Sequence, residues 1–315
     1  MFTPFTWDPA LNLQYNSANA SQVLYQSAAS LGRNAGTLFR MDAPDEIFVL
    51  CAVSGGAIDW NGGVVIESGI LRVDCSGNSN QFVLARHDAN GTLNIGRGEE
   101  KGRLEIYRPD HVFLSGAVIG VRENGEFAVV DCAGGVTIET GIQLEKNGVM
   151  EISSRDYVSP MDTTGWDKDN FQVRDNALLN VFVLGDYNVA TVVSDAGRAF
   201  IFASTLHLNQ QCTLTLDAGD GEIFVGGSAS MLVDIAEPAV TGAGGFNFMT
   251  TSGRNNGVFI LSAQVKGIQV NTVSAAQVLM LWGMLKINGV SQNSLSPFNI
   301  DVTSCPGQMI ISLKQ

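Results

Sequence analysis

Carboxylates and tryptophans are the side chains of this chain whose pairing could act on a sugar. They occur together in the region Asp59–Glu67 and in the region Asp156–Asp169. Two carboxylates at a set separation suffice for glycoside hydrolysis, and an indole ring offers a flat apolar face to a sugar ring. One prediction is therefore a module that binds or cleaves a polysaccharide. Its contact residues would be Asp59, Trp60, Trp166 and Asp167.

The motifs of other enzyme classes do not occur in the sequence. His87 precedes Asp88 and His111 follows Asp110. Because neighbours in a strand point to opposite faces, we interpret both as turn or surface histidines. There is no G-x-S-x-G nucleophile pattern and no phosphate-binding G-x-x-x-x-G-K-[ST] pattern. We predict no catalytic residue and no cofactor.

The cysteine spacing indicates neither a metal site nor a complete disulfide framework. No C-x-x-C and no histidine at zinc spacing occurs, and an odd number of cysteines cannot pair fully within one chain. Several follow apolar runs, where a free thiol packs as a small core residue. We predict no metal site and place the thiols in the core. They are Cys51, Cys75, Cys132, Cys212 and Cys305.

A repeat indicates the elements that must position these residues. Residues 59–70 read DWNGGVVIESGI and residues 131–142 read DCAGGVTIETGI, so one pattern recurs at an offset of 131 − 59 = 72 in the chain. Looser copies consist of a glycine followed by alternating large apolar residues, the pattern of a half-buried strand. A glycine can turn there with positive φ at no steric cost. The copies begin at Gly69, Gly91, Gly102, Gly125, Gly148, Gly221, Gly257 and Gly283.

The spacing of these copies predicts the fold. The offset from Gly69 to Gly91 is 22, and the offsets from Gly102 to Gly125 and from Gly125 to Gly148 are both 23. The long repeat then corresponds to about three units of about 24 residues, each too short to bury its apolar face without stacked neighbours. We predict an all-β parallel β-helix with about 22–24 residues per coil. A β-sandwich is the alternative, because short alternating strands with frequent turns also indicate that fold.

Composition agrees with an all-β protein and narrows its partners. Charged residues make up 16% of the 315 residues, against about 25% in an average protein. The net charge of −13 argues against nucleic acid as a partner, because phosphate backbones bind clustered Lys and Arg. The acids on the repeat faces are interpreted as solvated side chains. They are Glu67, Glu105, Glu139 and Glu151.

No membrane contact is expected. The sequence shows neither a secretory signal nor a run of about 18 apolar residues. We expect the protein to be made in a cytoplasm and to stay there, or to leave it by lysis or within an assembled particle.

Residues 1–44 are predicted to form an N-terminal arm or cap. A short helix or an irregular arm is expected there, because apolar residues within Ser17–Gly32 approach helical spacing ahead of a glycine. Phe2, Phe5 and Trp7 are candidates for a docking segment, and the alternative is that they cap the β core.

The β-helix is predicted over residues 45–238, with a projecting loop at 153–174. Residues 239–315 form an apolar C-terminal β region that holds four cations and Asp301 alone, so its net charge is 4 − 1 = +3. Uncharged apolar surface often marks an interface, so we predict oligomerisation through this region. The alternative is strands that are buried on both faces.

The alternating Gly-x-Leu-x-Ile units over about residues 45–235 resemble the right-handed parallel β-helical repeats of phage tail and fibre proteins and of autotransporter passenger domains. The chain departs from autotransporters by lacking a secretion signal. The resemblance implies a non-enzymatic virion component (tail, fibre or decoration protein). It also implies a homo-oligomer, commonly a trimer, whose partners are other virion proteins. The alternative it implies is a receptor-binding or depolymerase module for cell-surface polysaccharide.

Overall fold

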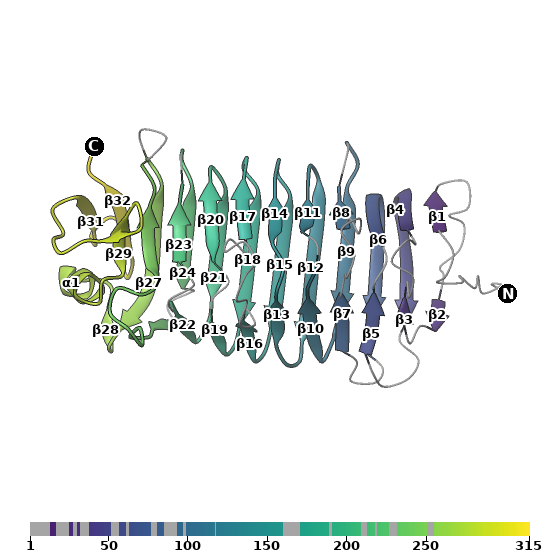
Figure 1. Cartoon of the computed structure of the whole chain (residues 1–315), viewed down its shortest axis with the longest axis horizontal. Helices are drawn as coiled ribbons and strands as arrows, with labels where there is room; N and C mark the ends of the chain where they lie inside the picture. The colour runs from purple at the N-terminus through teal and green to yellow at the C-terminus, as the bar shows by residue number, and fades with distance from the viewer. Residues whose placement is uncertain are drawn as a thin grey trace. The chain divides into compact units, whose positions relative to one another are not determined.

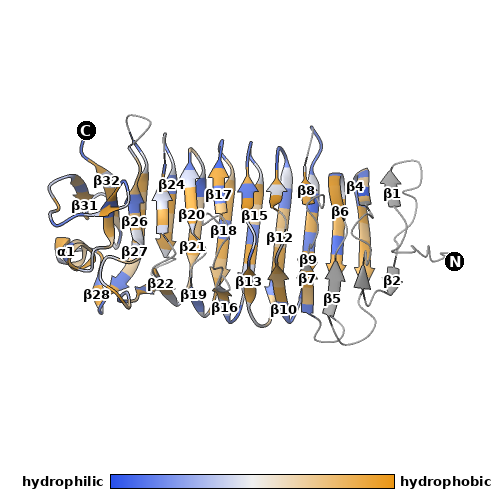
Figure 2. Cartoon of the chain, viewed as in Figure 1, coloured by the Kyte–Doolittle hydropathy of each residue, from blue (hydrophilic) through white to orange (hydrophobic). Residues whose placement is uncertain are grey.

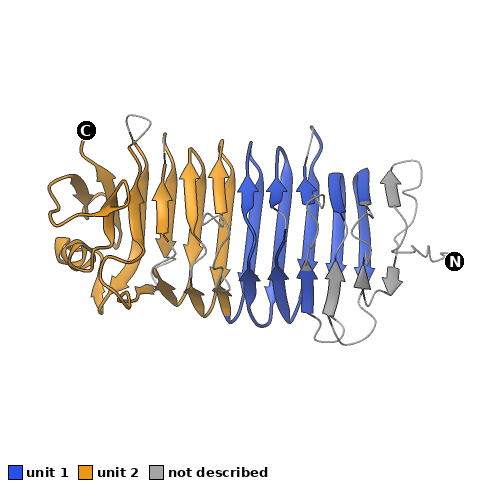
Figure 3. Cartoon of the chain, in the orientation of Figure 1, with its two compact units in different colours: residues 1–156, 161–166 blue, residues 157–160, 167–315 orange. Residues whose placement is uncertain are grey.

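The computed structural model describes most of the chain as two compact units (Figure 3). Unit 1 comprises Met1–Asp156 with Met161–Trp166, and unit 2 comprises Tyr157–Pro160 with Asp167–Gln315. The described residues are 13–16, 25–27, 30–31, 38–51, 57–60, 63–76, 81–84, 93–96, 99–116, 118–159, 171–188, 191–208, 213–217, 219–226, 232–250 and 255–315.

Short strands make up almost all of the regular structure (Figure 1). Those of unit 1 are β1 (Leu13–Asn16), β2 (Tyr25–Ser27), β3 (Ser30–Leu31), β4 (Leu38–Cys51), β5 (Ala57–Trp60), β6 (Gly63–Asp74), β7 (Gln81–Leu84), β8 (Leu93–Ile95), β9 (Gly102–Tyr107), β10 (His111–Leu114), β11 (Ile119–Val121), β12 (Gly125–Cys132), β13 (Val136–Ile138), β14 (Ile142–Leu144) and β15 (Val149–Ser154).

Unit 2 adds one helix to its strands. Its elements are β16 (Tyr157–Ser159), β17 (Phe171–Arg174), β18 (Leu178–Val183), β19 (Asp186–Asn188), β20 (Val192–Asp195), β21 (Arg198–Phe202), β22 (Thr205–His207), β23 (Thr213–Leu216), β24 (Glu222–Gly226), β25 (Val233–Ile235), β26 (Gly245–Phe248), β27 (Val258–Val265), β28 (Ile268–Gln269), α1 (Val273–Leu281), β29 (Leu285–Ile287), β30 (Val290–Ser291), β31 (Phe298–Asp301) and β32 (Met309–Leu313).

Successive coils pair in parallel, strand on strand. In unit 1, Gly102 of β9 pairs with Gly125 of β12, an offset of 125 − 102 = 23, and β12 pairs in parallel with β15. In unit 2, Leu179 of β18 pairs with Ala199 of β21, an offset of 199 − 179 = 20. This pattern confirms the predicted parallel β-helix. It excludes the β-sandwich, whose sheets are antiparallel.

The core of each unit consists of columns of apolar side chains that point inward from register-matched positions. One column of unit 1 contains Leu71, Leu104, Phe127 and Met150, none of which is more than 2% exposed. Each such side chain contributes roughly 1.5–3 kcal/mol by leaving water. Figure 2 shows the apolar residues recurring along the strands of both units.

The glycines that precede the strands are required mainly by space. Gly102 and Gly125 do not have positive φ, whereas Gly69 does, at 83°. A Cβ on Gly102 would lie 2.7 Å from the carbonyl oxygen of Ile66, and one on Gly125 would lie closer still to that of Ile95. The backbone of the preceding coil therefore occupies the place of a side chain at these corners. The expected positive φ is confirmed at Gly69 and is wrong at Gly102 and Gly125.

The two copies of the twelve-residue pattern do not occupy equivalent places in the coil. Along one ladder of unit 1, Val64 pairs with Leu93, Leu93 with Ile119 and Ile119 with Ile142. The offset over three coils is therefore 142 − 64 = 78, which exceeds the repeat offset of 72 by six. The interpretation of this repeat as three coils is wrong, because turn lengths vary. The coil from Gly69 to Gly102 alone has an offset of 102 − 69 = 33.

The described residues within Ser17–Gly32 form short strands and not the predicted helix. Strand β2 pairs in parallel with Tyr25 opposite Val49 of β4, and β3 pairs in parallel with β5. The edge of a coil presents unpaired backbone N–H and C=O groups that an extended segment can satisfy and a helix cannot. The backbone hydrogen bonds gained in this way outweigh the weak local preference for a helix. Strand β4 also continues through residue 44, where the arm was expected to end.

The projecting loop expected at 153–174 is partly strand. Strand β15 continues to Ser154, β16 forms at Tyr157–Ser159 and β17 at Phe171–Arg174. Residues 160–170 lie outside the described residues. The charged and glycine-containing composition of this segment concealed short strands that are stabilised by pairing with neighbouring coils.

Helix α1 and antiparallel strands change the pattern near the C-terminus. Strand β28 pairs antiparallel with β27, β30 with β29, and β32 with both β27 and β31. Helix α1 buries Ala275, Ala276 and Leu279. It ends in a Schellman motif, in which the N–H of Gly283 (φ 71°) donates to Met280 O and that of Met284 to Leu279 O. The prediction of β structure here missed this helix, since a short apolar run does not distinguish helix from strand.

Replacement of Phe127 by alanine tests the inward column. We expect Phe127→Ala to lower the free energy of unfolding by about 3–5 kcal/mol, because the cavity cannot close in a stacked column. Urea unfolding followed by circular dichroism measures the loss. The matched control is Phe113→Ala in β10, whose ring is only half-buried. Equal losses in the two variants would contradict the assignment of Phe127 to the core.

Candidate functional site

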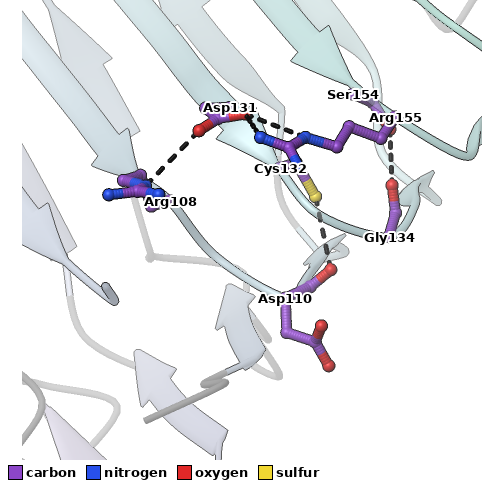
Figure 4. A network of polar contacts seen from close by, with 7 residues as sticks. All are labelled: Arg108, Asp110, Asp131, Cys132, Gly134, Ser154 and Arg155. Atoms are coloured by element: carbon purple, nitrogen blue, oxygen red, sulfur yellow. Dashed lines mark hydrogen bonds and ion pairs between the residues drawn. The ribbon is translucent and has the colours of Figure 1, made fainter. Parts of the chain in front are cut away.

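The candidate site is a polar pocket of about 180 Å³ at a corner of unit 1. It lies where β9 and β12 end and the chain turns. Figure 4 shows the polar contacts around it, with Asp131 between two arginines. The lining residues are Cys75, Ser76, Arg108, Pro109, Asp110, Asp131, Ala133 and Arg155.

The backbone brings the three charged side chains of the site from successive coils. Arg108 and Asp131 both have left-handed φ values, 51° and 52°. The N–H of Arg108 donates to Val130 O at 2.8 Å, and that of Arg155 to Cys132 O at 3.0 Å. The offset from Arg108 to Asp131 is 131 − 108 = 23, and the offset from Asp131 to Arg155 is 155 − 131 = 24. One coil length therefore separates each charge from the next.

Asp131 pairs with both arginines. Its Oδ1 accepts hydrogen bonds from Arg155 Nη2 at 2.7 Å and Nε at 3.1 Å, and its Oδ2 lies 3.4 Å from Arg108 Nε. The side chains of Arg108, Asp131 and Arg155 are 52%, 38% and 57% exposed. Water and salt screen such pairs, so each contributes at most about 1 kcal/mol. The negative charge of Asp131 is thus offset by arginines from the coils on both sides, and these ion pairs link three coils.

Two buried thiols lie behind the charged corner. Burial, followed by the charge of Asp74, raises the pKa of Cys75 to about 12. Burial is also the largest cause that raises the pKa of Cys132 to about 12, and its Sγ lies 3.5 Å from Asp110 O. A thiol with such a pKa stays protonated at neutral pH and is a poor nucleophile. The prediction of core thiols is confirmed for Cys75 and Cys132.

The other cysteines are less informative. Cys305 is half-buried and free. Cys212 and the side chain of Cys51 lie outside the described residues.

His111 holds a turn. Its Nδ1 accepts a hydrogen bond from the N–H of Gly135 at 3.0 Å, and its Nε2 is 4.0 Å from Asp110 Oδ2. A Cβ at Gly134 would collide with the imidazole ring. The imidazole therefore packs under the turn of the next coil from its place in β10. His207 lies 3.4 Å from Asp186, and His87 lies outside the described residues.

Carboxylates on the outer face of β9 and β12 are also engaged in ion pairs between coils. Glu105 lies 2.7 Å from Arg72 and 3.1 Å from Arg103, and Glu126 pairs with both Arg103 and Lys101. Glu105 and Glu126 are only 5% and 6% exposed. The interpretation of Glu105 as a solvated acid is therefore wrong, because stacked cations cover it.

Glu67 and the remaining face acids differ in their surroundings. Glu67 accepts hydrogen bonds from Arg40, the shortest at 2.8 Å, so it is paired as well. Glu139 and Glu151 are half-buried.

The predicted carbohydrate-contact residues stay a prediction, because the described residues do not include their side chains. Asp59 and Trp60 belong to β5, where they pair with Val83 and Leu84 of β7, and their side chains lie outside the described residues. Trp166 and Asp167 also lie outside the described residues. The same holds for the docking candidates Phe2, Phe5 and Trp7.

Sequence reasoning missed the corner of Arg108, Asp131 and Arg155. The available signal was the alternation of charge at offsets of 23 and 24, which match the coil length. The repeated pattern of glycines and apolar residues has the same period but does not include these charges. Asp131 also occupies a turn position, with a left-handed φ of 52°.

Across the described ranges, no group of three or more His, Cys, Asp or Glu side chains could hold a metal ion. Within the same ranges, no helix has the length and hydropathy to cross a bilayer. Comparison with known proteins found no matching family model, curated protein or solved structure.

Asp131→Asn tests the charged corner. Asparagine tolerates left-handed φ, so the substitution removes the charge and keeps the turn. We expect the free energy of unfolding to fall by about 0.5–1 kcal/mol at low salt. The loss should shrink at about 1 M NaCl, where the screening length is about 3 Å. Asp131→Ala should cost more, because alanine adds backbone strain. A loss independent of salt would contradict an ionic role.

The buried thiols predict a loss of stability at high pH. Their pKa is about 12 in the fold and 9.0 without burial. The stabilisation is therefore complete below pH 9.0 and is lost as the pH rises toward 12. Urea unfolding across this range should show a decline that is less steep in Cys75→Ala/Cys132→Ala. An identical decline in the two proteins would show that other groups cause it.

Proposed function

We propose that this protein is a non-enzymatic structural component of an assembled particle, of the phage virion type, and that it forms homo-oligomers. The observation that carries the proposal is the use of carboxylates in the described coils. Glu105, Glu126 and Asp131 are each held by two cations of neighbouring residues or coils. Paired in this way, these carboxylates hold neighbouring coils together, which is a structural use of their charge.

The buried thiols support the same proposal. Cys75 and Cys132 are protonated at neutral pH because burial raises the pKa of each to about 12. Among the described residues, the corner pocket therefore offers no activated nucleophile.

The C-terminal part supports a finite assembly. Its antiparallel strands and α1 differ from the parallel strands of the coils, and capping structure of this kind prevents open-ended stacking. Three phenylalanine rings are buried within it, those of Phe246, Phe248 and Phe259. This is what the alternative of buried strands predicts. Some apolar side chains remain outside, including Leu281 at 70% and Val290 at 63% exposed. Oligomerisation through residues 239–315 would use these two.

An activity screen separates the structural proposal from the polysaccharide alternative. Incubation of the purified chain with a panel of bacterial capsular polysaccharides should release no reducing ends and no unsaturated products. Product release that disappears in Asp59→Asn or Asp167→Asn would overturn the proposal in favour of a depolymerase. Release that persists in these variants would equally overturn the non-enzymatic assignment.

Incorporation into particles tests the docking segment. The triple variant Phe2→Ala/Phe5→Ala/Trp7→Ala leaves every described strand intact, since β1 begins at Leu13. We expect unchanged circular dichroism and loss of the protein from purified particles, measured by quantitative mass spectrometry. The matched control is Phe113→Ala. Normal incorporation of the triple variant would contradict a docking role for these residues.

A further inference from the structure

A ladder of phenylalanines covers the outer face of β18, β21 and β24 in unit 2. The ring centroids of Phe182 and Phe202 are 6.4 Å apart, those of Phe202 and Phe224 5.7 Å, and those of Phe200 and Phe224 5.8 Å. Phe182 is 42% exposed, and the other three are half-buried. In unit 1, the outward positions of β9 and β12 include the charged side chains of Arg103, Glu105 and Glu126.

The outward residues of β21 and β24 form three rows that run across the two strands. In the first row Arg198 pairs in register with Glu222, and in the second Phe200 pairs with Phe224. In the third row Phe202 lies beside Gly226, because Ile201 pairs with Val225. The rows therefore place a cation beside an anion, a ring beside a ring, and a ring beside a position without a side chain.

We propose that this face pairs with the same face of a second copy of the chain, about a two-fold axis that runs parallel to the strands between β21 and β24. The inference rests on the proposed homo-oligomer. It names a contact surface for that oligomer and a two-fold arrangement in place of the expected trimer.

Rotation about such an axis keeps each row at the same level along the strands. It places β21 of one copy opposite β24 of the other. Arg198 of one copy then faces Glu222 of the other, and this pair occurs twice. Phe200 faces Phe224 of the other copy. Phe202 faces Gly226, a buried position at which the backbone of Ser262 occupies the direction of a side chain, so this ring meets backbone and not a second side chain. The face is complementary to itself in charge, as a two-fold contact requires.

Charge also favours a second copy as the occupant. The chain carries a net charge of −13, so two copies repel each other over most of their surfaces. On this face Arg198 and Glu222 balance, and the other outward side chains of β18, β21 and β24 are apolar except that of Asn180, which pairs in register with Phe200. Among the described residues, neither the side chain of Arg198 nor that of Glu222 lies within 4.0 Å of an oppositely charged group. Both remain available for a partner across the contact.

Charge reversal with restoration tests the proposal. Sedimentation equilibrium of the full chain should show a dimer, and Arg198→Glu and Glu222→Arg should each weaken it at least about tenfold by placing like charges opposite each other. The double variant Arg198→Glu/Glu222→Arg should restore the affinity to within about threefold. Phe202→Asp should also dissociate the dimer. Val118→Glu, at a 46% exposed position of unit 1, is the control and should leave the dimer intact, whereas Leu281→Glu tests the alternative contact through residues 239–315.

The outcomes separate this surface from the general proposal. A wild-type chain that stays monomeric at tens of micromolar overturns both the two-fold contact and the homo-oligomer. Dissociation by Leu281→Glu but not by the charge reversals overturns the contact at the phenylalanine ladder and keeps the homo-oligomer. A double variant as weak as the single variants overturns the pairing of Arg198 with Glu222. Circular dichroism of each variant confirms that the fold is retained.

Discussion

Each coil of this protein can satisfy its backbone only through the coils on either side. A parallel β-helix has few hydrogen bonds within a coil, so nearly every N–H and C=O of a strand pairs with the strand one coil away. This constraint dictates what the corners allow. Where the backbone of the preceding coil comes close, as at Gly102 and Gly125, a side chain would collide with its carbonyl oxygen. Where the turn requires left-handed φ, Asp131 or Gly69 accepts it.

Stacking also multiplies the effect of a single side chain. An inward residue packs on its counterparts one coil above and one below, so Leu104 and Phe127 belong to one continuous column. An outward residue likewise faces its counterparts, and charges of opposite sign at one coil spacing become ion pairs. Glu105 with Arg72, Glu126 with Arg103, and Asp131 with Arg108 and Arg155 are formed in this way. Polar side chains therefore contribute to cohesion between coils.

The outward side chains differ between the two units, although both units have the same kind of fold. In unit 1 they form ion pairs, and in unit 2 they form a phenylalanine ladder beside Arg198 and Glu222. The same backbone ladders support both, because the inward columns and corners carry the packing. The difference lies in what each face can bind. A face of paired charges is satisfied by itself, whereas exposed rings gain from being covered. The end of unit 2 is different again, since α1 and antiparallel strands replace the parallel pattern there.

The sequence by itself determined the all-β class, the parallel β-helix and a coil of roughly 23 residues, because a glycine followed by alternating apolar residues is a local signal repeated many times. It also indicated that Cys75 and Cys132 are core thiols. Only the tertiary structure decided which residues stack. It showed that the long repeat is shorter than three coils, and that residues 25–27 pair as a strand. It also showed that Glu105 is buried between arginines. The physical reason is that turn length varies from coil to coil, so register depends on contacts between strands that are far apart in the chain. A local pattern cannot report these contacts.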